Sequence, residues 1–398
     1  MKILFYADTV FSFGGVQRVL AVVAKALSAT HDVTILTTDL AEDRSMYDYK
    51  SSNVRFDFIS YKSARDFQYF LCKACSFLYK RFLPKNSLTA RLYSFSFFLP
   101  RYKSALMWKI NDGGYDVVVG VHAFLSLHLA SVRSKISAPV TVGWMHNSYD
   151  ALFEKQNPYL PGMKSFFSQE MRRLEKLVVL TENDAALFKS NLDIDSVVIY
   201  NPLTLSPRGM ASFDHRKFLA VGRFSPLHKG FDILLKAFAL FSKSNADWTL
   251  EIVGEGEEEK LYRQIIAEEN LGHRVLISPF TSDIQRHYSA ASFFVLSSRW
   301  EGQPLVLVEA MAHGLPVISS DIPVVRELLT GNGASVMFSN GDVMDMAETM
   351  KRMASTEEWT KLSQKAVAFS RDFCVDETCA KWNSVFMGKW FGDNHFFL

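Results

Sequence analysis

Short apolar runs alternate with helical patterns along most of the 398-residue chain. This alternation predicts an α/β fold, in which parallel β-sheets are wrapped by helices. In the first half the expected strands are residues 2–7, 32–37, 54–59, 116–121, 140–144, 177–180 and 197–200. In the second half they are residues 217–221, 249–253, 275–278, 293–296, 316–319 and 334–338.

The alternating pattern restarts after Asn201-Pro202-Leu203, in a stretch that contains Pro and Ser and is typical of a linker. A chain of this length is too long for one ordinary core, and two domains of roughly 200 residues are expected. We therefore predict two Rossmann-like domains, residues 1–205 and 206–380, facing each other across a cleft. Ligands bind between domains in such architectures.

The composition is that of a globular protein, with 48% hydrophobic residues and a net charge of +2. The overall charge therefore says little about partners. The N-terminus enters a strand-like run without the pattern of a signal peptide, and there is no apolar stretch of about 18 residues or more. A cytoplasmic location is expected.

One region departs from the alternation, because residues 67–111 contain no Asp or Glu but many Lys, Arg and aromatic residues. Such a segment suits a membrane interface, where rings enter the headgroup layer and basic side chains meet anionic lipid. The alternative is a helical insertion whose rings fill the core. Since packing does not require the depletion of acids, we favour an insertion at about 61–110 that meets the inner face of the plasma membrane. Nucleic acid would also suit such a segment, but the nearly neutral chain argues against it.

Two glutamates eight positions apart, Glu301 and Glu309, mark the most informative stretch of the chain. A continuous helix would place both carboxylates on one face, but Gly302 and Pro304 oppose helix at the start. The sequence instead predicts a loop carrying Glu301, followed by a helix that opens near Pro304 and carries Glu309 in its second turn. The free N–H groups of a helix N-terminus between two carboxylates can hold an anion and hydroxyls together, as a nucleotide sugar requires.

A second basic loop follows the first strand of the second half. Arg223 and Lys229 are placed to clamp a diphosphate, because guanidinium offers a fork and ammonium a mobile point charge. Gly230 suits a tight entry to the next helix. Basic loop residues are usually just solvated, but together with Glu301 and Glu309 a phosphate site becomes the better interpretation.

Paired glycines, Gly14 and Gly15, lie between the first strand and the first helix. They would allow the backbone to approach a phosphate closely, although the spacing is not the dinucleotide-binding fingerprint. An ordinary structural turn is an equal alternative. Arg18, one turn into the helix, either holds an acceptor phosphate or is solvated.

Other strand ends offer further candidates. Gly254 could line a nucleotide pocket, and Pro279 and Phe280 could place backbone groups and a ring beside a uracil, although ordinary strand exits would look the same. His122 and His146 also follow strands and could donate to a sugar hydroxyl or a developing charge. A satisfied structural histidine is the alternative, and we favour function for His122 more than for His146.

The chain lacks other recognisable catalytic motifs. Asp193-Ile194-Asp195 precedes a strand instead of following one, so no metal is predicted. No Gly-x-Ser-x-Gly or Walker-type loop is present. No cofactor is expected apart from a nucleotide-sugar substrate.

With these segments in order, nearly the whole chain resembles the GT-B glycosyltransferases of family 4, the retaining group. The motifs that carry the resemblance are Gly222-Arg223 with Lys229-Gly230, and residues 251–256, 298–304 and 314–319.

The resemblance implies roles for the candidate residues. Arg223 and Lys229 would hold the donor diphosphate, Glu309 the nucleotide ribose, and Glu301 the hydroxyls of the transferred sugar. His122 matches the family's histidine near the reacting centre. The remaining donor-site positions would be Gly15, Gly302, Gln303, Pro304 and Leu305. Residues 381–398 would return to the N-terminal domain, as they often do in this family.

The predicted activity is transfer of a hexose or N-acetylhexosamine from a nucleotide-diphospho-sugar, UDP-linked by preference, to a polyprenyl-diphosphate-linked glycan of a bacterial surface polysaccharide. Retaining transfer would proceed at the front face of the sugar, without a protein base. Gln303 replaces a residue that is commonly apolar in the family, which leaves the donor sugar open. The alternatives are a UDP-sugar 2-epimerase of the same fold, and a non-catalytic subunit that binds sugar or membrane.

Overall fold

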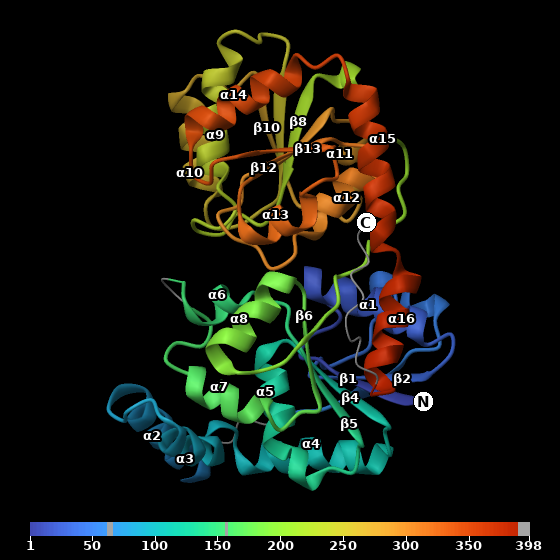
Figure 1. Cartoon of the computed structure of the whole chain (residues 1–398), viewed down its shortest axis with the longest axis vertical. Helices are drawn as coiled ribbons and strands as arrows, with labels where there is room; N and C mark the ends of the chain where they lie inside the picture. The colour runs from blue at the N-terminus through green and yellow to red at the C-terminus, as the bar shows by residue number, and fades with distance from the viewer. Residues whose placement is uncertain (62–66, 156–157, 389–398) are drawn as a thin grey trace. The chain divides into compact units, whose positions relative to one another are not determined.

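The computed structural model describes residues 1–61, 67–155 and 158–388, which form two compact units (Figure 1). Among the described residues, unit 1 comprises Met1–Pro202 and residues 375–388, and unit 2 comprises Leu203–Cys374. Both are α/β, with parallel strands throughout, as predicted.

The chain passes between the units slightly earlier than the predicted limits, at 202/203 instead of 205/206 and at 374/375 instead of 380/381. The second difference arises because helix α16 (Val375–Phe386) is continuous and packs on unit 1 from its start. Of the segment predicted to return, residues 381–388 are described, and residues 389–398 lie outside the described residues.

The seven-stranded sheet of unit 1 has the order β3-β2-β1-β4-β5-β6-β7. Its strands are β1 (Lys2–Tyr6), β2 (Asp32–Thr37), β3 (Arg55–Phe58), β4 (Val117–Val121), β5 (Val140–Trp144), β6 (Lys176–Val179) and β7 (Val197–Val198). The central strands are buried on both faces, which explains why they read as unbroken apolar runs.

Helices cover both faces of this sheet, with α5 and α7 over one face and α1 and α16 over the other. The helices are α1 (Gly15–Leu27), α2 (Phe67–Arg81), α3 (Ser87–Phe97), α4 (Pro100–Gly113), α5 (Ala123–Val132), α6 (Tyr149–Phe153), α7 (Lys164–Met171) and α8 (Glu182–Leu192). The described part of the unit also contains the 3-10 turns η1 (Met46–Ser51) and η2 (Arg133–Lys135).

The six-stranded sheet of unit 2 has the order β10-β9-β8-β11-β12-β13. Its strands are β8 (Lys217–Val221), β9 (Thr249–Val253), β10 (Val275–Ser278), β11 (Phe293–Leu296), β12 (Val317–Ser320) and β13 (Ser335–Phe338). Its helices are α9 (Phe231–Ser242), α10 (Glu259–Glu268), α11 (Gln285–Ser289), α12 (Leu305–Ala312), α13 (Pro323–Leu329), α14 (Val343–Ala354) and α15 (Trp359–Ser370), with 3-10 turns η3 (Phe213–His215) and η4 (Arg371–Phe373).

Every predicted strand is present, with shifts of one or two residues at some ends. The strand order of each sheet reverses once, between β1 and β4 in unit 1 and between β8 and β11 in unit 2. Loops that leave the carboxyl ends of two such strands diverge and leave room for a ligand. These two sheet edges are therefore where binding residues are expected.

The predicted insertion is helical and forms α2, α3 and α4. Some of its rings are buried, as the packing alternative expected, among them Tyr79, Tyr93 and Phe98, whereas Phe70 and Phe77 are exposed. Among the residues described, no helix is both long enough and apolar enough to span a bilayer.

Replacement of Trp382 by Ala tests whether α16 is an integral part of unit 1. The Trp382 ring is fully buried and lies 4.8 Å from Trp144 and 6.4 Å from Phe5, measured between ring centroids. The loss of this ring should lower the free energy of unfolding by about 3–5 kcal/mol in urea denaturation. Trp108→Ala is the matched control, because Trp108 is 59% exposed, and should cost less than about 1 kcal/mol. Equal effects of the two changes would contradict the role of α16.

Candidate functional site

We call the carboxyl ends of the two strands at which the strand order reverses the reversal edge of a sheet. In unit 2 these strands are β8 and β11, and the two loops that follow them are bound to each other. Residues 222–230 connect β8 to α9, and residues 297–304 connect β11 to α12. The backbone N–H of Arg299 donates to the carbonyl of His228 at 2.9 Å, and the Ser297 hydroxyl donates to the carbonyl of Lys229 at 2.8 Å. The two loops therefore act as one rigid rim.

An ion pair lies within this rim, between Lys229 Nζ and Glu301 Oε1 at 2.7 Å. The two side chains are 14% and 8% exposed, so water screens the pair little. Ser298 donates its hydroxyl to the same carboxylate oxygen at 2.6 Å, and His228 Nε2 lies 3.7 Å from the other oxygen. The structure thus brings together two of the predicted residues and adds two that the sequence did not single out.

Glu301 is held in its charged form. Burial by itself would raise the pKa of this carboxyl, but the charge and hydrogen bond of Lys229, with the nearby imidazole of His228, outweigh burial and lower the pKa to about 2. Glu301 is therefore a permanent hydrogen-bond acceptor near neutral pH. It is not suited to donate a proton.

Two glycines make room for the pair. A Cβ atom on Gly222 would lie 3.0 Å from Cε and 3.1 Å from Cδ of Lys229, so the lysine stem packs directly over this residue. Gly230 has φ +64°, and a Cβ there would lie 2.1 Å from the carbonyl oxygen of Ser297. Any other residue at position 230 would push the two loops apart, whereas a side chain at position 222 would displace the lysine stem.

Arg223 takes a different place from Lys229 although it lies on the same loop. Its side chain is exposed, whereas the neighbouring Phe224 is buried and its N–H donates to the carbonyl of Glu255 at 2.8 Å. The expected joint clamp of Arg223 and Lys229 on a diphosphate stays a prediction.

Helix α12 begins where the sequence predicted, with Pro304 as its N-cap and Leu305 as its first residue. Its first N–H groups have no acceptor within the helix and can meet an anion. Gln303 is buried just before the cap, and Gly302 is half-buried between it and Glu301. The rim therefore presents a cation, a carboxylate and a helix N-terminus along one short stretch.

Glu309 lies in the second turn of α12 and is 1% exposed. Its Oε1 accepts a hydrogen bond from the Thr204 hydroxyl at 2.6 Å, and its Oε2 accepts one from the Tyr288 hydroxyl at 3.1 Å. The carboxylate is thus oriented by hydroxyl groups, which a ribose diol could replace. Binding of ribose by Glu309 stays a prediction.

The other candidates of unit 2 have simpler explanations. A Cβ atom on Gly254 would lie 2.0 Å from the carbonyl oxygen of Gly222, so this glycine is required by the close approach of two loops. Pro279 and Phe280 follow the edge strand β10 and are exposed, with Phe280 at 45%. Nucleotide contacts at these three residues stay predictions.

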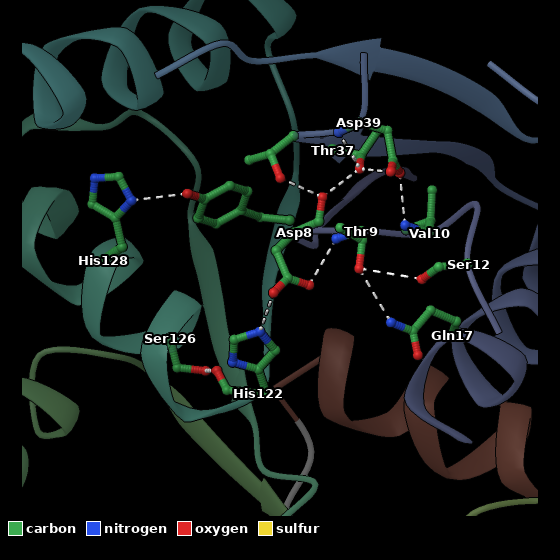
Figure 2. Close-up of polar contacts among 12 residues, drawn as sticks. Asp8, Thr9, Val10, Ser12, Gln17, Thr37, Asp39, His122, Ser126 and His128 are labelled. Carbon is green, nitrogen blue, oxygen red and sulfur yellow. Dashed lines mark hydrogen bonds and ion pairs between the residues drawn. The ribbon is translucent and has the colours of Figure 1, made fainter. Parts of the chain in front are cut away.

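The reversal edge of unit 1 carries a second pair, His122 and Asp8 (Figure 2). His122 follows β4 and Asp8 follows β1 after one residue; His122 Nε2 lies 3.4 Å from Asp8 Oδ2. The pKa of Asp8 is lowered, because the hydrogen bond from His122 favours the carboxylate more than partial burial opposes it. The sequence did not single out Asp8, although its place at the end of the first strand was the available signal.

The backbone of His122 is in an unusual conformation, with φ 62° and ψ 166°. This region is almost restricted to glycine and costs about 1–3 kcal/mol in other residues. The surrounding bonds impose it, since the N–H of His122 donates to the carbonyl of Trp144 at 2.8 Å and its carbonyl accepts from the Ser126 N–H at 3.0 Å. In Figure 2 the imidazole of this residue points toward Asp8.

Gly15 is the exposed first residue of α1, and Gly14 is its N-cap. The loop before it is held by Tyr47, whose hydroxyl donates to the carbonyl of Ser12 at 2.8 Å and accepts from the N–H of Gly14 at 3.1 Å. Arg18 is half-buried one turn into α1, and its charge acts on Tyr47. Phosphate binding by Gly15 or Arg18 stays a prediction. No local pattern in the sequence indicated that Tyr47 would hold this loop.

His146, which neighbours His122, lies in a buried environment. Burial, with the neighbouring His122, lowers the pKa of His146 to about 3, so its ring is neutral near pH 7. Its ring centroid lies 4.3 Å from that of Trp144, and its Nε2 atom is buried and lacks a hydrogen-bond partner among the described residues. This environment favours a packing role, and substrate contact by His146 stays a prediction.

Within the described ranges, no group of three or more His, Cys, Asp or Glu residues could hold a metal ion. The expectation that the protein needs no metal stays a prediction.

Removal of one partner of the Lys229–Glu301 ion pair should lower the stability of the fold. Lys229→Met leaves the Glu301 charge buried and unpaired, and should lower the free energy of unfolding by about 3–5 kcal/mol at pH 7. The double change Lys229→Met/Glu301→Leu is the control and should recover most of the loss, because it removes both charges. Urea denaturation of the three proteins measures this, and a double variant as unstable as the single one would contradict it.

The same pair predicts a pH dependence with a definite sign. The pKa of Glu301 falls from an ordinary value of 4.5 to about 2 in the folded state, so its stabilising contribution is complete above pH 4.5. It is lost as the pH falls from there toward 2. In Lys229→Met, protonation of Glu301 begins at higher pH, so the deficit relative to the wild type should shrink in acid. A deficit that is constant with pH would contradict the pairing.

The backbone strain at His122 predicts that a Gly variant at this position is more stable than an Ala variant. His122→Gly and His122→Ala lose the same ring, but only Gly tolerates φ 62° and ψ 166°. The Ala variant should therefore be less stable than the Gly variant by about 1–3 kcal/mol, measured by urea denaturation. If Ala is as stable as Gly, the backbone is not held in the strained region.

Two family models match consecutive parts of the chain. The model described as Glycosyltransferase Family 4 matches residues 13–206, and the model described as Glycosyl transferases group 1 matches residues 211–371. The second range contains both glutamates and the basic loop of unit 2.

Curated relatives match parts of the chain. An uncharacterized glycosyltransferase of Haemophilus influenzae is 30% identical over 215 residues, which cover 53% of this chain and 61% of the relative. The amylovoran biosynthesis glycosyltransferase AmsD of Erwinia amylovora is 28% identical, with 55% and 66% covered. The GDP-mannose:cellobiosyl-diphosphopolyprenol alpha-mannosyltransferase of Xanthomonas oryzae pv. oryzae is 28% identical, with 60% and 64% covered. The chain thus spans a little under two thirds of the length of these relatives.

Solved structures match over nearly the full length. The apo form of the lipopolysaccharide outer core galactosyltransferase WaaB has a TM-score of 0.68 at 18% identity, with 98% of this chain and 100% of that one covered. Anabaena Alr3699/HepE in complex with UDP and glucose has a TM-score of 0.70 at 16% identity, with 97% and 100% covered. At these identities the likeness establishes the fold, which is that of the GT-B glycosyltransferases. The two family models show that the chain belongs to the group 1 glycosyltransferases, with an N-terminal part of the glycosyltransferase family 4 type.

Proposed function

We propose that this protein transfers a hexose or N-acetylhexosamine from a nucleotide-diphospho-sugar to a polyprenyl-diphosphate-linked glycan, with retention of configuration at the sugar. The observation that carries the proposal is the buried pair of Lys229 and Glu301 in front of the N-terminus of α12. A cation, a fixed carboxylate and free N–H groups match the diphosphate and the hydroxyls of such a donor.

The donor would be held by unit 2. Lys229, with the exposed Arg223 of the same loop, would neutralise the diphosphate together with the first N–H groups of α12. Glu301 would accept hydrogen bonds from sugar hydroxyls through Oε2, which has His228 at 3.7 Å, while Oε1 is already bound by Lys229 and Ser298. Glu309 would take the ribose hydroxyls.

Retention would follow from substitution at the front face of the sugar. The bond between C1 and the donor phosphate oxygen breaks, the acceptor oxygen bonds to C1 from the same side, and the acceptor proton passes to the departing phosphate. No protein base is required. The protein's contribution would be electrostatic, and the fixed charge of Glu301 fits a role in binding better than one in proton transfer.

The acceptor would be held by unit 1. The imidazole of His122, positioned by Asp8, could donate to or accept from an acceptor hydroxyl, and Arg18 with the N–H of Gly15 could meet its phosphate. A relative named as acting on a cellobiosyl-diphosphopolyprenol supports an acceptor of this class. Such an acceptor is anchored in lipid, which supports a peripheral location on the inner face of the plasma membrane.

The nucleotide would be UDP. The exposed ring of Phe280 after β10 suits stacking on a base, and structures of the same fold contain UDP. A relative named for GDP-mannose makes GDP the alternative to be tested beside it.

The two other readings of the site make distinct predictions. A 2-epimerase would convert the donor without an acceptor, and a binding subunit would convert nothing. An epimerase acts on a soluble substrate and would not need the basic, aromatic insertion of residues 67–111. A non-catalytic binding subunit would not need a carboxylate that is kept ionised in a buried site.

Glu301→Gln provides the direct test. The change preserves shape but removes the charge, and should reduce transfer by about 100-fold or more while the protein stays folded. A panel of UDP- and GDP-sugars with a polyprenyl-diphosphate-linked acceptor would give the rates, and the anomeric configuration of the product would be determined by NMR. Glu348→Gln is the matched control, because Glu348 is exposed on α14. Wild-type transfer by Glu301→Gln, an inverted product, or conversion of donor without acceptor would each contradict the proposal.

A further inference from the structure

Helix α2 is attached to unit 1 by one face. The Tyr79 ring is buried and stacks on Tyr93 of α3, with 4.1 Å between centroids and 7° between planes. Ser76, three residues earlier, lies with its hydroxyl 3.1 Å from that of Tyr93. The same side of α2 therefore repeatedly meets α3, and Figure 1 shows the two helices as a pair at the edge of unit 1.

The opposite face of α2 is apolar and exposed. At about 100° per residue, its large apolar side chains fall within an arc of about 140°, opposite Ser76 and Tyr79. Their exposed fractions range from 49% to 80%, which is far more than core residues show. We call these residues, together with Phe82 directly after the helix, the α2 stripe: Phe67, Phe70, Leu71, Phe77, Leu78 and Phe82.

Positive charge accompanies the stripe. Lys73 and Lys80 project along one flank of it, and Arg81 ends the helix. The sequence from residue 67 to 111 has no Asp or Glu, so no acid of this segment opposes these charges. Apolar side chains that flank cations on one helix face are typical of helices that lie in a membrane interface.

We infer that the α2 stripe binds an anionic lipid surface, with its phenylalanine and leucine side chains in the headgroup region and Lys73 and Lys80 on the lipid phosphates. Charge distinguishes this partner from a second copy of the chain, because two such faces brought together would place like charges side by side. The inference rests on the proposed membrane location but not on the transfer reaction.

Ring contacts connect the attached face of α2, through Tyr79 and Tyr93, with the site in unit 1. Tyr93 lies 5.4 Å from Phe97, and Phe97 lies 5.8 Å from Phe124, measured between centroids. Phe124 belongs to the first turn of α5, two residues after His122. A lipid surface held by α2 would thus be joined through packed rings to the element that positions His122, which suits an acceptor whose lipid end stays in the membrane.

Flotation of the full-length protein with lipid vesicles tests the inference. The wild type should float with vesicles that contain phosphatidylglycerol and much less with pure phosphatidylcholine. Phe70→Glu/Phe77→Glu should reduce partitioning by more than about tenfold, and Lys73→Glu/Lys80→Glu should reduce it at low salt. Leu78→Glu and Leu261→Glu form a matched pair, since both leucines lie on helices and are 49% and 42% exposed. Only Leu78→Glu should weaken binding.

Unchanged flotation of Phe70→Glu/Phe77→Glu would overturn the inference, and so would equal effects of the matched pair. Self-association that the same double change abolishes, without vesicle binding, would assign the stripe to a second copy. Urea denaturation should show wild-type midpoints, because the altered side chains are exposed. Transfer to a soluble acceptor analogue should also be unchanged in these variants, so a failure of the proposed function and a failure of this inference are distinguishable.

Discussion

The buried ion pair of Lys229 and Glu301 is the constraint on which the rim of unit 2 depends. Two desolvated charges are costly unless their geometry is well defined, so the neighbouring backbone must bring them to hydrogen-bond distance. Gly222 leaves space for the lysine stem, Gly230 allows the loop to turn beside Ser297, and the two loops are bound through their backbones. Residues of the predicted ligand-binding motif are therefore also required to fold the rim.

In unit 1 the candidate pair of side chains is held in place by a different interaction. Its sheet also reverses direction once, and its candidate pair also joins side chains from the two strands at the reversal. However, Asp8 and His122 are more accessible than the pair in unit 2, and backbone strain at His122, not burial, sets their geometry. An accessible imidazole that is oriented in advance suits a mobile acceptor, whereas a buried permanent charge suits the fixed hydroxyls of a donor sugar.

Much of the fold could be predicted because parallel strands covered on both faces read as unbroken apolar runs. The start of α12 was also predictable, since Pro304 has the fixed φ that a helix start accepts and Glu309 follows in its second turn. The partners of the candidate residues were not predictable. Thr204 and Tyr288 reach Glu309 from positions 105 and 21 residues away, and no local pattern indicates such contacts.

The sequence by itself determined the two α/β units, their strands and most of the candidate residues where the strand order reverses, because hydrophobic periodicity and the special requirements of Gly and Pro act locally. Only the tertiary structure decided which of these residues meet. It paired Lys229 with Glu301, left Arg223 exposed, added Asp8 to His122, and divided the rings of residues 67–111 between the core and an exposed face. The physical reason is that burial and pairing energies depend on distances across the sheet, which are set by strand order and not by separation along the chain.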